Sequence, residues 1–250
     1  GAKAIASSVR VQVNMFAANF NLGLYPPIIK SYAEGERKEM FSLMTNGSKV
    51  TFFLLWIFAF PLFLEMETVL RLWLGEVPPH VVLFTRLGLI DSLFLAIGNP
   101  IATAARAPGK MKGYELTLGS IQAAIFFVAW IVLKAGAPAY SVYLISIVAN
   151  LIMLFVRLAL VKRLVELPVL PFIRQCFMPV VRVSILSLML SLPVYYYIPE
   201  GIFYSGIIVA CSVLFSCVSM YYLGMDQALR CKLRMMIVSR VQMLLKRTVV

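Results

Sequence analysis

The sequence has few charged residues: Asp, Glu, Lys and Arg occupy 14% of its 250 positions, against about 25% in soluble globular proteins. Hydrophobic residues make up 61%, and the mean hydropathy is +0.89. Such a chain has too little polar surface to enclose a water-soluble core. The composition argues against a soluble enzyme, a nucleic-acid-binding protein and a disulfide scaffold, and it predicts an all-α, polytopic membrane protein.

Residues that commonly carry catalysis or bind metal ions are also scarce. The only histidine, His80, follows two prolines, and no sequence pattern pairs it with a carboxylate. The four cysteines show no CxxC spacing, and most lie in or beside apolar segments, as small buried side chains do. They are Cys176, Cys211, Cys217 and Cys231. We therefore expect no enzyme activity, no metal site and no cofactor.

Long apolar segments without a two-residue alternation predict transmembrane helices and not a barrel. About 20 helical residues cross a hydrocarbon core of about 30 Å, and seven segments reach this length. They are residues 4–30, 43–64, 80–104, 114–134, 139–161, 179–198 and 201–224.

The connections between these spans carry further expectations. Residues 135–138 and 198–201 are short enough to form tight hairpins, and residues 65–79 indicate an interfacial helix or turn. Pro26-Pro27 is expected to close the first span, and Gly98-Asn99-Pro100 to kink or interrupt the third.

Basic residues are distributed unevenly between the two sides of the spans. One side, with the C-terminal tail, holds 18 of the 23 lysines and arginines. Because Lys and Arg accumulate in cytoplasmic loops, this side is predicted to be cytoplasmic, with residue 1 outside and the C-terminus inside. The net charge of +12 thus indicates orientation and not a nucleic-acid partner. The five basic residues of the other side are Lys3, Arg10, Arg71, Arg86 and Lys134.

The first span carries polar residues along its whole length. At 100° per residue, six of them fall within about 60° of one another and form what we call the polar stripe. They are Lys3, Ser7, Arg10, Asn14, Asn21 and Tyr25. A second cluster, on the opposite side, consists of Ser8, Gln12 and Asn19. We expect one set to line a water-filled cavity and the other to hydrogen-bond to neighbouring helices; the alternative is that both only bond between helices. Arg10 favours a cavity, because an intramembrane arginine requires water or an anion.

The third span contains two charged residues, Arg86 and Asp91. They are five positions apart, about 140° around a helix, and are not expected to pair. Asp91 lies near the middle of the bilayer, where it either binds Na⁺ or H⁺ in a coupled transporter or hydrogen-bonds to a neighbouring helix; both interpretations stay open. Arg86 has the length to extend toward the membrane surface.

From Asp226 onward the chain is basic and amphipathic, with apolar residues at helical spacing. This pattern predicts a cytoplasmic surface helix held by anionic membrane lipids.

Three segments resemble bacterial oligosaccharide and polysaccharide flippases of the O-antigen type. These are GAKAIASSVRVQVNMFAANFNLGLYPPIIKSYAEGERKEMFSLM, LEMETVLRLWLGEVPPHVVLFTRLGLIDSLF and IATAARAPGKMKGYEL. The family has a MATE-like fold and belongs to the multidrug/oligosaccharidyl-lipid/polysaccharide exporter superfamily. The resemblance covers about residues 1–165, and the last two spans agree in hydropathy and position only.

The resemblance implies that the chain is a fragment that corresponds to spans eight to fourteen, with a preceding N-terminal lobe as its partner. Residues 1–163 would form the C-terminal lobe, 164–224 two additional spans, and 225–250 the tail. The implied function is transport of an oligosaccharide on an undecaprenyl-pyrophosphate carrier across the bacterial inner membrane. Family cavities are cationic, and the positions that suit substrate binding here are Arg10, Asn14, Asn21, Arg86 and Lys3. The alternatives are a multidrug exporter driven by Na⁺ or H⁺, with Asp91 as the ion site, and a membrane-embedded glycosyl- or acyltransferase.

Overall fold

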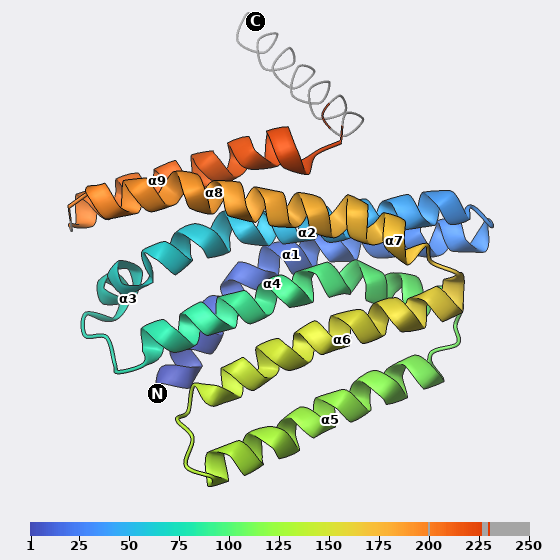
Figure 1. The fold of residues 1–250 in the computed structure, drawn as a ribbon, viewed down its shortest axis with the longest axis horizontal. Helices are drawn as coiled ribbons and strands as arrows, with labels where there is room; N and C mark the ends of the chain where they lie inside the picture. Colours follow the sequence, from blue (N-terminus) through green and yellow to red (C-terminus); the bar gives the residue numbers. More distant parts are fainter. Residues whose placement is uncertain (200, 227–229, 231–250) are drawn as a thin grey trace, which may run out of the picture.

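The computed structural model describes residues 1–199, 201–226 and 230, and every element in this part is helical. The α-helices are α1 (Ala2–Ala33), α2 (Arg37–Leu64), α3 (Met66–Leu74), α4 (Val81–Arg106), α5 (Lys112–Lys134), α6 (Ser141–Val165), α7 (Val169–Phe172), α8 (Met178–Tyr197) and α9 (Ile202–Ser219). One π-helical turn, Ile173–Phe177, joins α7 to α8, and another, Met220–Gly224, continues α9. The long helices lie side by side and reverse direction at each connection (Figure 1).

Six helical segments are long and apolar enough to cross a membrane, which indicates a multi-pass membrane protein. They are α2, α4, α5, α6, the continuous segment Val169–Tyr197, and Ile202–Gly224. The first predicted span is helical throughout as α1, but it is not one of these six, because polar residues lower its hydropathy. Seven spans therefore remain a prediction.

The turns that follow α1, α4 and α6 lie at one end of the bundle, which we call the basic end (Figure 1). Arg37, Arg106, Lys110 and Arg163 are at or next to these turns. The opposite end holds residue 1, α3, the α5–α6 connection and the α8–α9 hairpin. The two predicted hairpins and the short helix within residues 65–79 are thus confirmed.

Helix α2 lies in the middle of the bundle and packs against α1, α4, α8 and α9. Its buried face contains Phe52, Trp56 and Phe60 at i, i+4 spacing, with ring centroids 5.7 Å and 5.0 Å apart along the stack. The Trp56 indole donates a hydrogen bond of 3.1 Å to the Ser187 hydroxyl on α8. This contact fixes the last two apolar helices against the rest of the chain.

Helix α5 lies at the edge of the bundle and packs against α6 (Figure 1). Only 11% of its most apolar 18-residue stretch is buried, and Phe126, Phe127 and Trp130 are exposed. An outward apolar face of this kind suits contact with lipid chains and does not suit water. Helix α4 has the contrasting position, because it packs against α1, α2 and α6.

The prolines of the first and third predicted spans do not end their helices, and a kink at Gly98-Asn99-Pro100 stays a prediction. Helix α1 continues through Pro26 and Pro27 to Ala33, and α4 continues through Pro100 to Arg106. A proline removes one N–H and leaves the carbonyl four residues earlier without its helical donor. Before Pro26 and Pro27 these carbonyls belong to exposed residues, so the helix is not forced to end.

Three further expectations have mixed outcomes. The sixth predicted span begins earlier than residue 179, because α7 and the π-helical turn extend it back to Val169. The division at residue 163 into a lobe and two additional spans stays a prediction. The amphipathic tail, residues 225–250, lies outside the described residues except for Met225, Asp226 and Arg230.

Candidate functional site in the polar face of the bundle

The polar stripe of α1 lies along α4, and the structure divides it between two pockets. Lys3, Ser7 and Arg10 line one pocket, which we call the Arg10 pocket. Asn21 and Tyr25 line the other, which we call the Arg157 pocket. The expectation that this side of α1 lines a cavity therefore agrees with the structure.

The Arg10 pocket has a volume of about 390 Å³ and is bounded by α1, α4 and the start of α6. The Arg10 guanidinium lies 3.3 Å from one carboxylate oxygen of Asp91. The other oxygen of Asp91 accepts a hydrogen bond from the side-chain amide of Asn150 on α6. The Asp91 side chain is only 5% exposed, whereas Arg10 is 39% exposed and reaches the cavity. With Lys3 also on its wall, the pocket holds two cations and one carboxylate.

Between the two pockets, Asn14 in the middle of the polar stripe joins α1 to α4 by a hydrogen bond. The amide of Asn14 donates 2.7 Å to the hydroxyl of Ser92 and 2.8 Å to the backbone carbonyl of Arg10. A cavity of about 10 Å³ between α4 and α6, lined in part by Asn150, Gly98 and Arg157, is too small for more than one water molecule.

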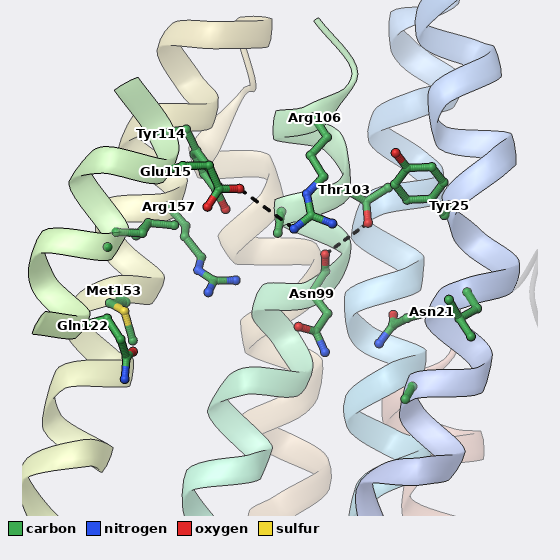
Figure 2. A pocket seen from close by; sticks show the side chains of 15 residues that line it. Asn21, Tyr25, Asn99, Thr103, Arg106, Tyr114, Glu115, Gln122, Met153 and Arg157 are labelled. Atoms are coloured by element: carbon green, nitrogen blue, oxygen red, sulfur yellow. Dashed lines mark hydrogen bonds and ion pairs between the residues drawn. The ribbon is translucent and has the colours of Figure 1, made fainter. Parts of the chain in front are cut away.

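The Arg157 pocket has a volume of about 600 Å³ and receives side chains from α1, α4, α5 and α6. Figure 2 shows Arg106 and Arg157 extending toward this space from α4 and α6, with Asn21 on the side of α1 and Gln122 on α5. Asn99, Thr103 and Arg106 follow one another at i, i+4 and i+7, which places them on one face of α4.

Positive charge exceeds negative charge in the Arg157 pocket. Arg106 lies 4.0 Å from Glu115, its carboxylate neighbour. Arg157 donates a hydrogen bond of 3.2 Å to the backbone carbonyl of Gly98, and no carboxylate lies within 4.0 Å of it in the described part of the chain. A Cβ at position 98 would lie 3.2 Å from the Arg157 guanidinium, so glycine permits this close approach.

Two further polar atoms of this pocket have no hydrogen-bond partner among the described residues. They are the amide nitrogen of Asn21 and the hydroxyl of Tyr114, both buried. The hydroxyl of Thr51 lies 2.9 Å from the oxygen of Asn21 and 2.8 Å from the backbone carbonyl of Gly47, and its single proton serves one of the two. Buried polar groups are usually paired, and unpaired donors beside an arginine indicate a site for a ligand or water that accepts hydrogen bonds.

The structure does not bring Arg86 together with the other predicted substrate-binding residues. Its guanidinium donates to the backbone carbonyls of Phe63 and Leu64, and it lines a different pocket beside α3. The prediction that Arg86 and Asp91 do not pair is confirmed, because the described ion pair of Asp91 is with Arg10.

The second polar cluster of α1 makes no hydrogen bond to another helix among the described residues. Ser8, Gln12 and Asn19 are exposed, and the Ser8 hydroxyl bonds to the Ala4 carbonyl of its own helix. They lie on the outer face because α2 and α4 cover the side of α1 that holds Ala6, Val13 and Ala17.

Sequence reasoning missed Arg106 and Arg157 as site residues, because both were counted with the basic residues of the loops. A signal was present: Arg157 lies inside the predicted span 139–161, and a charge within a span is functional by default. That both arginines line the same pocket depends on how α4 packs against α6.

Comparison with known proteins finds no match among family models, curated protein sequences or solved structures. These comparisons therefore carry no property of a known protein over to this chain.

Proposed function

We propose that the protein transports an anionic, lipid-linked oligosaccharide across a membrane. The observation that carries this proposal is the Arg157 pocket, in which an arginine without a carboxylate partner lies next to unpaired hydrogen-bond donors between apolar helices. An arginine fork binds phosphate oxygens with two parallel hydrogen bonds. A phosphate or diphosphate group bound by Arg157 would share this pocket with Arg106 and Asn21.

The arrangement of the two pockets supports alternating access. They lie toward opposite ends of one polar face shared by α1, α4 and α6, and the hydrogen bond of Asn14 on α1 to Ser92 on α4 lies between them. A transporter requires a site that communicates with one side at a time, usually near helices that move relative to each other. The contact of Asn14 with Ser92 and that of Arg10 with Asp91 would break and reform as α1 moves on α4.

The nature of the substrate comes from the resemblance to O-antigen-type flippases. It would be an oligosaccharide on an undecaprenyl-pyrophosphate carrier, moved from the cytoplasmic to the outer leaflet of a bacterial inner membrane. In the predicted orientation the Arg157 pocket is near the cytoplasmic end, where such a substrate would enter. Arg10 and Lys3 would then contact the anionic group near the outer end.

The test compares charge-removing variants of α6 in the full-length protein, by complementation of a flippase-deficient strain at matched membrane abundance. Arg157→Gln should lower export of the lipid-linked sugar about tenfold or more, since hydrogen bonds to charged groups contribute about 1.5–3 kcal/mol. Arg157→Lys should recover part of this loss, because lysine keeps the charge without the fork. Arg163→Gln is the matched control, because Arg163 is an exposed residue of the same helix that does not line the pocket. Normal export by Arg157→Gln would contradict the proposal.

A second candidate function, an exporter of drugs driven by Na⁺ or H⁺, is favoured by one observation. Asp91 is a buried carboxylate with contacts from three helices: its own α4, Arg10 on α1 and Asn150 on α6. Binding of an ion to Asp91 would release Arg10 and loosen α1 from α4. In this case Asp91→Asn should abolish export driven by an ion gradient, whereas the flippase proposal expects the larger loss from Arg157→Gln. Transport of cationic drugs in reconstituted vesicles, with and without a gradient, distinguishes the two functions.

A further inference from the structure

A third cavity lies at the end of the bundle opposite the basic end, away from the polar face of α1, α4 and α6. This Arg86 pocket has a volume of about 630 Å³ and lies between α3, the start of α4 and the α8–α9 hairpin. The hydroxyl of Ser205 on α9 donates 3.3 Å to the hydroxyl of Thr68 on α3, and this bond ties the two walls together. Tyr195 and Tyr196 of α8 line the same cavity.

Glu65 supplies a negative charge to this pocket. It lies at the junction of α2 and α3, is only 7% exposed, and accepts a hydrogen bond of 3.0 Å from the Thr68 hydroxyl. In the described part of the chain no basic group lies within 4.0 Å of its carboxylate. A carboxylate withdrawn from water is stabilised by a cation, so a cationic ligand would complete this site.

Arg86 supplies a positive charge that is also uncompensated. Its Nε and Nη2 donate 2.9 Å and 3.2 Å to the carbonyls of Phe63 and Leu64 at the end of α2, and its guanidinium lies 5.4 Å from the Phe63 ring centroid. These contacts fix the group while its Nη1 makes no hydrogen bond to a described residue. No described carboxylate is within 4.0 Å, so Arg86 and Glu65 do not neutralise each other directly. The other two charges of the pocket, Glu67 and Arg71, do pair, at 2.8 Å.

The residues around the pocket are of the kinds found at the depth of lipid headgroups. Helix α3 buries Met66 and Leu70 and exposes Leu72 and Trp73, as a helix at the membrane interface does. Tryptophan and tyrosine side chains are enriched at this depth. Beyond the pocket, the surfaces of α8 and α9 are apolar and exposed, as at Leu192 and Phe203, which would accommodate acyl chains.

We propose that the Arg86 pocket binds the zwitterionic headgroup of phosphatidylethanolamine, with the ammonium at Glu65 and the phosphate at Arg86. One separated negative and one separated positive charge match a headgroup of this type. A primary ammonium donates up to three hydrogen bonds to a recessed carboxylate, whereas the trimethylammonium of phosphatidylcholine donates none. Phosphatidylglycerol provides the phosphate but no cation. The inference is independent of the transport proposal, because it uses residues outside the Arg10 and Arg157 pockets.

The test measures which lipids the full-length protein retains. The protein is placed in nanodiscs that contain equal amounts of phosphatidylethanolamine, phosphatidylcholine and phosphatidylglycerol, then released and examined by native mass spectrometry after mild delipidation. We expect the wild type to keep one phosphatidylethanolamine in preference to the other two. Glu65→Gln preserves the size of the side chain and its bond from Thr68, and should lower this retention about tenfold or more.

Glu76→Gln is the matched control, because Glu76 is exposed, follows α3 and does not line the pocket. It should retain the lipid as the wild type does. Arg86→Gln should weaken retention of every phospholipid; if it does not fold, the wild-type selectivity and the Glu65→Gln variant still decide the proposal. Equal retention of phosphatidylethanolamine and phosphatidylcholine by the wild type would overturn it, as would unchanged retention by Glu65→Gln.

The soluble analogue O-phosphoethanolamine distinguishes a membrane lipid from a free metabolite. Because acyl chains contribute apolar contacts, the free headgroup should not displace the bound lipid at millimolar concentration. Displacement at micromolar concentration would assign the site to a soluble ligand and overturn the proposal.

Discussion

The guanidinium of Arg10 and the carboxylate of Asp91 form an ion pair of 3.3 Å that joins α1 to α4, although the two residues are 81 positions apart in the chain. This pair connects a helix that is too polar to count among the six apolar spans to the best-packed part of the bundle. The packing role of Arg10, which holds α1 against α4, can be separated by experiment from its proposed role in binding an anion.

The first prediction separates these roles by double substitution. Arg10→Gln alone leaves a buried carboxylate without its cation and should lower the free energy of unfolding by about 1–3 kcal/mol; the lower end applies because Arg10 is 39% exposed. Arg10→Gln with Asp91→Asn should regain most of that stability, since no unpaired charge remains. Thermal unfolding in detergent measures the stability. If Arg10 also binds the substrate, export stays low in the double variant; full export would mean that its charge serves packing only.

The second prediction concerns Lys49, whose side chain is 1% exposed within α2. Its ammonium lies 2.9 Å from the carboxylate of Asp226, which is 60% exposed and lies just beyond α9. Asp226→Asn should lower the free energy of unfolding by about 1–3 kcal/mol, because it leaves a buried lysine without a counter-ion. Lys49→Met combined with Asp226→Asn should restore it. Glu166→Gln, a change of the same kind in a turn at the same end of the bundle, should have little effect.

The third prediction tests close helix packing at two glycines. A Cβ at Gly224 would lie 2.6 Å from ring atoms of Phe53, and a Cβ at Gly47 would lie 2.7 Å from the end of the flexible Leu24 side chain. Gly224→Ala should destabilise the protein by about 1–3 kcal/mol, because an aromatic ring cannot move aside. Gly47→Ala should cost less.

Gly206→Ala is the control for this series, because nothing lies within 4 Å of a Cβ at that position of α9. It should be neutral or slightly stabilising, since alanine is the better helix former. Equal effects of the three substitutions on the unfolding temperature would contradict the packing described here.

The fourth prediction concerns orientation in the membrane. With the native cysteines replaced, a membrane-impermeant maleimide should label Glu76→Cys in intact cells, and Lys110→Cys only after the membrane is opened. The reason is the unequal distribution of basic residues, which places the basic end in the cytoplasm. The reverse pattern of labelling would invert the topology and the proposed direction of transport.

The class of protein and the order of its helices could be predicted from the amino-acid sequence. Continuous apolar segments have one stable arrangement in lipid, because every backbone N–H and carbonyl must be satisfied within the segment. The stripe on the first span also followed from helical geometry alone, and Arg10 and Asn21 do line cavities. The local effect of proline did not follow, since α1 and α4 both continue through their prolines.

Which polar residues contact one another became known from the packing of the helices. The pairing of Asp91 with Arg10, the separation of Arg86 from both, and the meeting of Arg106 with Arg157 each depend on how one helix is rotated and shifted against its neighbours. Apolar packing of this kind arises from many small contacts between side chains distant in the sequence. A periodic pattern states which face of a helix is polar, but it does not state which other helix that face contacts.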